Sequence, residues 1–120
     1  RNLDQLSVVA DQVGGPTPAC AIANACASLA QQLITQPELS GIYHFSGTPD
    51  ISRADFARDI LSQAGLNCRV EDSTTQAYDT PAQRPLNSRL DCDGLVALGL
   101  NRPQWRPIVN NILEIVEKKT

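Results

Sequence analysis

The first long run of helix-forming residues carries an apolar stripe along one side. Apolar side chains recur at helical spacing at Ile22, Cys26, Leu29 and Leu33, and alanines fill much of the sequence between them. Thr17 stands directly before Pro18, so the pattern predicts a helix that starts at Pro18 with Thr17 as its N-cap. Because the stripe is continuous, we expect this helix to be buried against a neighbouring element.

Two further helices are predicted from similar patterns. Ser52 is a good N-cap because Asp55 follows three residues later, and this helix should run to about Ala64 and stop at Gly65. The last helix starts near Trp105, which we expect to anchor it to the core. Its apolar stripe consists of Trp105, Ile108, Val109, Ile112, Leu113 and Val116.

Several short segments have the composition of strands rather than helices. The predicted strands are Leu6–Ala10, 42–45, 68–71 and 88–92. Asp93 is predicted to cap a short helix that ends at Gly99. Residues 72–87 show no periodicity and are predicted to form a long polar loop, a type that is often functional. Together these patterns predict one α/β unit with short strands and three to four helices.

Composition narrows the class of protein. A length of 120 residues favours a single domain over residues 1–120. The chain holds no methionine and starts at Arg1, so we expect it to be a piece of a longer polypeptide. A hydrophobic content of 42% argues against disorder, and a net charge of −3 without a basic run argues against nucleic-acid binding. Polar residues interrupt the apolar stretch 18–34, which argues against a membrane span.

Motifs that would carry catalysis are missing from the sequence. It contains no G-x-G-x-x-G, no P-loop and no G-x-S-x-G, and no tyrosine is followed four residues later by lysine. Its four cysteines lack zinc-binding spacing, and free thiols in a reducing cytoplasm are the favoured interpretation. His44 is interpreted as a structural residue on a strand rather than a general base. We therefore expect no catalytic residue and no metal ligand in this chain.

Candidate binding residues lie after the first strand and in the long loop. Asp11 and Gln12 follow the strand, where ligands of open α/β sheets bind; the alternative is that Asp11 starts a turn and Gln12 faces solvent. Arg84 is adjacent to Pro85, and its planar, permanently charged guanidinium suits a diphosphate. The alternative for Arg84 is a solvated surface group.

Five segments taken together resemble the C-terminal part of dTDP-4-dehydrorhamnose reductases, a family of extended short-chain dehydrogenases/reductases. The segments are LSVVADQVGGPTPA (6–19), GIYHFSG (41–47), SRADFARDI (52–60), TPAQRPLNSRLD (80–91) and PQW (103–105). The resemblance implies that this chain is the small substrate-binding domain. It also implies that a Rossmann domain outside the chain binds NADPH or NADH and carries the catalytic Tyr and Lys. Such a reductase converts dTDP-4-dehydro-L-rhamnose to dTDP-L-rhamnose for surface polysaccharide such as lipopolysaccharide.

The resemblance also implies which residues bind substrate. Gln12 and the turn from Gly14 to Thr17 would border the cleft for the nucleotide sugar. Arg84 and Asn87 would face the nucleotide or its diphosphate. No residue of this chain is expected to bind the cofactor.

Metal, partners and alternatives follow from the same resemblance. Some family members dimerise around Mg²⁺ held by glutamates, but Cys20 and Ile115 occupy those positions here, so Mg²⁺ is not expected. The expected partners are a dTDP-sugar and the chain's own Rossmann domain in the cytoplasm, with a homodimer as a further possibility. One alternative is a non-catalytic regulatory subunit on this scaffold, like the beta subunit of methionine adenosyltransferase. Another is a related reductase or epimerase that acts on a different nucleotide sugar.

Overall fold

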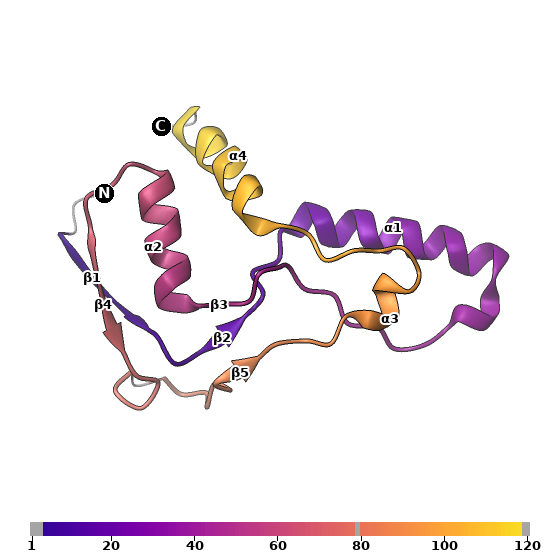
Figure 1. Ribbon diagram of the computed structural model, residues 1–120, viewed down its shortest axis with the longest axis horizontal. Helices are drawn as coiled ribbons and strands as arrows, with labels where there is room; N and C mark the ends of the chain where they lie inside the picture. Colours follow the sequence, from indigo (N-terminus) through magenta and orange to yellow (C-terminus); the bar gives the residue numbers. More distant parts are fainter. Residues whose placement is uncertain (1–3, 79, 119–120) are drawn as a thin grey trace.

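The structure is a computed structural model that describes residues 4–78 and 80–118. It confirms the predicted α/β class, with short strands and helices α1–α4 (Figure 1). In chain order the elements are β1 (Gln5–Val9), β2 (Val13–Gly14), α1 (Ala19–Thr35), a 3-10 turn (Pro37–Leu39), β3 (Ile51–Ser52), α2 (Arg53–Gln63), β4 (Arg69–Ser73), β5 (Asn87–Ser88), α3 (Asp93–Val96) and α4 (Trp105–Lys118).

Strands β1 and β4 form a two-stranded parallel sheet with α2 packed against both strands (Figure 1). The register pairs Leu6 with Val70 and Val9 with Ser73. Arg58 connects α2 to β4, because its guanidinium donates to the carbonyl of Val70. Because the strands are parallel, the chain leaves both at the same edge, and the segments after Val9 and Ser73 start side by side.

A second, smaller sheet places three distant segments together. Strand β2 lies in its centre, antiparallel to β3 and parallel to β5. Val13 is opposite Ser52 on one side and opposite Asn87 on the other. The segment that leaves β1 is therefore flanked by the start of α2 and by the end of the long polar loop.

Two glycines allow the backbone to cross itself next to this sheet. A Cβ atom on Gly47 would lie 1.8 Å from the carbonyl oxygen of Pro16, and one on Gly15 would lie 2.2 Å from the carbonyl oxygen of Gly47. The hydroxyl of Thr17 donates to the carbonyl of Gly15 and accepts from the amide of Gly47. A side chain at Gly15 or Gly47 would push the two backbone segments apart.

Trp105 is the centre of the small core beside this crossing. It is 1% exposed, and its indole N–H donates to the carbonyl of Pro49 at 2.8 Å. Its ring packs edge-on against the ring of Phe56, with 5.0 Å between the ring centroids. Among the residues whose side chains the structure describes, the other buried hydrophobic ones are Ala54, Cys92 and Leu95. The anchoring role predicted for Trp105 is confirmed.

The described chain is more extended than a compact domain of its size. Its radius of gyration is 17.3 Å, compared with about 14 Å for a compact chain of this length. Helix α1 projects away from β1, β4 and α2 (Figure 1). No residue of α1 is buried, and Ile22 is 43% exposed. The prediction that this helix is buried is wrong for the described chain: Ile22 and Cys26 of its stripe are exposed, and Leu29 and Leu33 are only half-buried.

The capping predictions had mixed outcomes. The hydroxyl of Ser52 accepts from the amide of Asp55, and Gly65 ends the helix region with a φ of 63°, so both ends of α2 are confirmed. Thr17 does not cap α1: the helix starts at Ala19, with Pro18 as N-cap, because the Thr17 hydroxyl is bonded at the backbone crossing.

The predicted strand at 42–45 is wrong. The segment has no strand pairing, Ile42 is 91% exposed, and the hydroxyl of Tyr43 donates to the nearby carbonyl of Leu39. His44 lies exposed in this segment rather than on a strand. Aromatic and β-branched composition alone does not supply a partner strand, and none of the described strands lies beside it.

The C-terminal half needs further corrections. The strand predicted over 88–92 is only Asn87–Ser88, and α3 has Cys92 as its N-cap, so Asp93 is the first helical residue. The carboxylate of Asp91 accepts from the amide of Asp93, so the helix starts one residue earlier than the prediction with Asp93 as N-cap. The predicted loop 72–87 begins later than expected, because β4 extends to Ser73. Within the described residues, no helix is both long and apolar enough to cross a bilayer.

Candidate functional site

The end of β1 is tied to the loop after β4 by a small polar network. The carboxylate of Asp11 accepts from the amide of Thr75 at 2.9 and 3.0 Å and from its hydroxyl at 2.7 Å. The side-chain amide of Gln12 donates to the same hydroxyl at 3.0 Å. Gln12 is only 7% exposed, so the alternative of a solvent-facing Gln12 is wrong.

The hydrogen bonds from Thr75 change the acidity of Asp11. The Thr75 amide, followed by the Thr75 hydroxyl, holds the pKa of Asp11 below its usual value. A carboxylate that accepts these bonds stays ionised at neutral pH. Asp11 is therefore suited to fixing the loop in place and not to exchanging protons.

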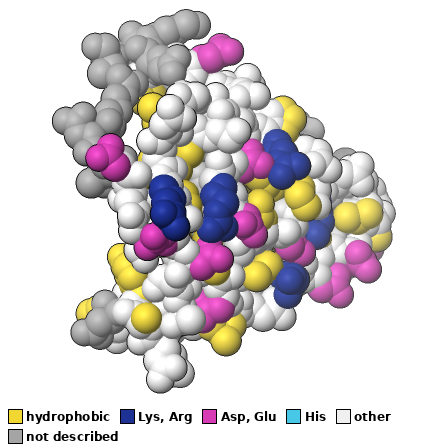
Figure 2. Space-filling view, turned by 60° about the vertical axis from the view of Figure 1, so that its left-hand side comes forward, with side chains coloured by type: hydrophobic (Ala, Val, Ile, Leu, Met, Phe, Trp, Pro, Cys, Tyr) yellow, Lys and Arg dark blue, Asp and Glu magenta, His cyan; other side chains and the backbone are white. Residues whose placement is uncertain are grey.

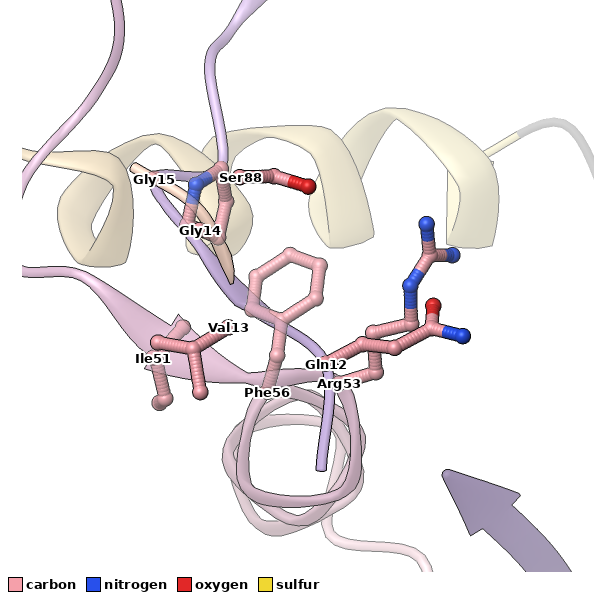
Figure 3. A pocket seen from close by; sticks show the side chains of 9 residues that line it. Gln12, Val13, Gly14, Gly15, Ile51, Arg53, Phe56 and Ser88 are labelled. Carbon is pink, nitrogen blue, oxygen red and sulfur yellow. The ribbon is translucent and has the colours of Figure 1, made fainter. Parts of the chain in front are cut away.

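One cavity of about 270 Å³ opens beside β2, and we call it the glycine cavity (Figure 3). Its lining residues are Gln12, Val13, Gly14, Gly15, Pro16, Ile51, Arg53, Phe56 and Ser88. Ile51 and the ring of Phe56 form an apolar wall, while the head groups of Gln12 and Arg53 lie together on the other side of that ring (Figure 3). The cavity thus has one apolar and one polar end.

A second cavity, also of about 270 Å³, adjoins the polar end, and we call it the arginine cavity. Its lining residues are Val9, Gln12, Arg53, Thr75, Tyr78, Thr80 and Arg84. Gln12 and Arg53 line both cavities and so stand between them. Beyond Arg84 the loop borders a wider groove of about 710 Å³.

The structure brings some of the predicted binding residues together and separates others. Gln12 and Gly14 line the glycine cavity, and Gln12 and Arg84 line the arginine cavity. Thr17 is bonded at the backbone crossing. Asn87 is exposed, and its side-chain oxygen accepts from the amide of Arg89 at 3.1 Å. The binding roles of all five residues stay predictions.

Arg53 and Thr75 are candidate residues that the sequence did not single out. Arg53 is the first residue of α2, where the positive end of the helix dipole disfavours a cation. A residue type that is unfavourable for its local structure often marks a functional position. The cation at the predicted helix start could therefore have pointed to Arg53 from the sequence. Thr75 gave no signal, because its role depends on the parallel pairing of β1 with β4.

Charge on the surface is mixed in sign. The face in Figure 2 shows Lys and Arg side chains interspersed with Asp and Glu, without a continuous basic patch. In the described ranges, no group of three or more His, Cys, Asp or Glu side chains could hold a metal ion.

Fold and site together define a small α/β binding domain with a polar cleft at the carboxyl ends of two parallel strands. Residues 1–118 match the family described as the RmlD substrate binding domain, and the chain belongs to this family. The match confirms the resemblance found in the sequence.

Relatives and solved structures agree with this assignment. A dTDP-4-dehydrorhamnose reductase of Sinorhizobium fredii is 40% identical over 109 residues, which cover 85% of this chain and 37% of that protein. A solved dTDP-4-dehydrorhamnose reductase of Clostridium acetobutylicum superposes with a TM-score of 0.81 at 28% identity, covering 96% of this chain and 40% of that one. The Bacillus anthracis enzyme, solved in complex with NADP, superposes with a TM-score of 0.79 at 29% identity, covering 90% and 37%. This chain therefore spans about two fifths of the length of these proteins.

Proposed function

We propose that this chain is the nucleotide-sugar-binding part of an NADPH-dependent dTDP-4-dehydrorhamnose reductase. The observation that carries the proposal is that Gln12 and Arg84, 72 positions apart in sequence, line one cavity where the parallel strands β1 and β4 end. Ligands of α/β sheets bind at this edge. The proposal places the protein in the cytoplasm, with a dTDP-sugar and a dinucleotide-binding domain as partners.

The residues of this chain would bind and orient the substrate. Gln12 is held by Thr75, so its amide is preorganised rather than mobile. Arg84 would pair with the diphosphate through its guanidinium, which forms two parallel hydrogen bonds to phosphate oxygens. Correct placement of a substrate can account for a large part of a rate enhancement.

The described residues do not fit a nicotinamide dinucleotide. Such a site needs a strand followed by a glycine-rich turn and a helix whose N-terminus faces the pyrophosphate. Here β1 is followed by Asp11 and Gln12 and then by β2, and β4 is followed by the polar loop. The turn from β2 to α1 does contain glycine, but Gly15 is packed against the carbonyl of Gly47 and the Thr17 hydroxyl is bonded to both residues, so this turn is closed by the chain's own backbone. NADPH would supply the hydride from a site outside this chain, and we derive no chemical step through it.

A chimera tests the proposal. The segment of the Sinorhizobium fredii reductase that aligns with this chain is replaced by the chain, and NADPH oxidation is followed with dTDP-4-dehydro-L-rhamnose. We expect the chimera to reduce the keto sugar, while this chain alone and the truncated relative alone do not. An Arg84→Ala chimera should have a raised KM, and an Arg69→Ala chimera serves as the control because Arg69 lies on β4 outside both cavities.

The outcomes separate the proposal from its alternatives. A chimera that folds and binds NADPH but reduces no keto sugar would contradict the reductase proposal and support a non-catalytic subunit. A chimera that reduces the keto sugar of another nucleotide equally well would contradict the assignment to dTDP-sugars. Selectivity for the base arises because a wrong base leaves polar groups unpaired.

A further inference from the structure

Two arginines differ from the others in how their charge is compensated. Five arginines lie within 4.0 Å of a carboxylate: Arg58, Arg69, Arg89, Arg102 and Arg106. Within residues 4–78 and 80–118, Arg53 and Arg84 have no such partner. Both of these arginines line the arginine cavity, although 31 positions of sequence separate them.

The other residues around the arginine cavity do not neutralise this charge. The described lining contains no aspartate or glutamate. Asp11 lines the adjoining groove, but its carboxylate is turned toward the amide and hydroxyl of Thr75 and forms no ion pair with Arg53 or Arg84. Two uncompensated cations at one cavity repel each other, and a bound anion replaces that repulsion by attraction to both.

The backbone of Arg53 is held at this position. Its amide donates to the carbonyl of Gln12 at 3.1 Å, which fixes the start of α2 against the segment that leaves β1. Tyr78, which is 55% exposed, adds a hydroxyl to the same lining. The cavity thus offers two guanidinium groups and a hydroxyl to a ligand that carries several acceptor oxygens.

We propose that Arg53 and Arg84 together bind the two phosphoryl groups of a diphosphate ester in the arginine cavity. This assignment rests on the proposed function for the diphosphate's source, a nucleotide sugar, and adds Arg53 as a second cation. A diphosphate suits two separate guanidinium groups better than a carboxylate does, because it presents acceptor oxygens on two centres. The anion also offsets the unfavourable placement of Arg53 at the helix N-terminus.

Calorimetric titration of the protein with dTDP, thymidine and inorganic pyrophosphate tests the assignment. Arg53→Ala and Arg84→Ala should each weaken dTDP binding by about tenfold or more, which is typical of a lost hydrogen bond to a charged group. The double variant should lose less than the product of the two single losses, because both residues act on one ligand. Thymidine binding should not change, and Arg53→Lys should restore part of the dTDP affinity.

Arg69→Ala is the matched control, since it removes the same charge from β4 outside the cavity. Unchanged melting temperatures would show that the variants fold, as expected for the exposed side chains of Arg53 and Arg84. If Arg53→Ala binds dTDP as tightly as Arg69→Ala does, the two-arginine site is wrong. Failure of the protein to bind dTDP at all would also overturn it.

The titrations distinguish this inference from the proposed function. If pyrophosphate, dTDP and UDP bind equally and all depend on both arginines, the anion site stands and the assignment to dTDP-sugars fails. If dTDP-L-rhamnose binds selectively but without any dependence on Arg53, the proposed function stands and the two-arginine site fails.

Discussion

The guanidinium of Arg102 lies 2.7 Å from the carboxylate of Asp50. Arg102 also donates to the carbonyl oxygens of Ser46 and Gly47 and to the Ser46 hydroxyl. One side chain thus connects the segment before α4 with the segment before β3. Because Gly15 approaches the same group, this cluster holds the backbone crossing that positions the glycine cavity.

Removal of the Arg102 side chain should therefore destabilise the whole chain. Both partners are about three quarters buried, at 25% and 24% side-chain exposure. Arg102→Ala leaves two carbonyl groups without their donor and leaves Asp50 with only the longer 3.9 Å ion pair to Arg89. We expect a loss of about 2 kcal/mol in the free energy of unfolding, measured by urea denaturation. Arg69→Ala, whose exposed side chain lies 3.6 Å from Glu71, should change it little. Equal stability of the two variants would contradict a role for Arg102 in holding the crossing.

Gly47 is expected to tolerate no side chain. A Cβ atom there would lie 1.8 Å from the carbonyl oxygen of Pro16, and backbone atoms cannot rotate away as a flexible side chain can. Gly47→Ala should lower the free energy of unfolding by more than about 2 kcal/mol. Gly41→Ala is the control, since its nearest neighbours are Tyr43 ring atoms at 3.8 Å or more. A stable Gly47→Ala protein would show that the two backbone segments can separate at little cost.

Asp11 should make stability depend on acidity. Its pKa is lowered in the folded chain by the amide and then the hydroxyl of Thr75, from a usual value of 3.8. The unfolded chain therefore takes up a proton at a pH where the folded chain does not. The contribution is present above the usual value and is lost as the pH falls below it and through the folded pKa.

Unfolding measured between about pH 2 and 6 checks this sign. Asp11→Asn should flatten the acid limb of the stability curve, whereas Thr75→Val should flatten it only in part because the Thr75 amide remains. An acid limb that is identical in the original protein and in Asp11→Asn would contradict the assigned hydrogen bonds.

Local signals in the sequence predicted local structure well. Ser52, Gly65 and the stripe from Trp105 gave the ends of α2 and the start of α4, because caps and helical spacing depend on residues within one or two turns. The short parallel pair β1–β4 matches two of the predicted strands for the same reason. The family of the chain was predicted from its sequence motifs and not from these local patterns.

Features that depend on distant partners were not predictable. Composition indicated a strand at 42–45, but a strand needs a partner, and the described strands pair elsewhere. The Thr17 hydroxyl is bonded to Gly47, 30 residues away, rather than to α1. The candidate site shows the same limit: Gln12 and Arg84 were found from their local context, whereas Thr75 emerged only from the register of β1 with β4.

The central claim is that the glycine cavity and the adjoining arginine cavity bind a dTDP-sugar. Backbone amide chemical shifts of the isotopically labelled protein, recorded during titration with dTDP-L-rhamnose, test it most directly. We expect saturable shifts at Gln12, Gly14, Arg53, Thr75 and Arg84, with α1 unaffected. An absence of saturable shifts, or shifts confined to α1, would contradict the account.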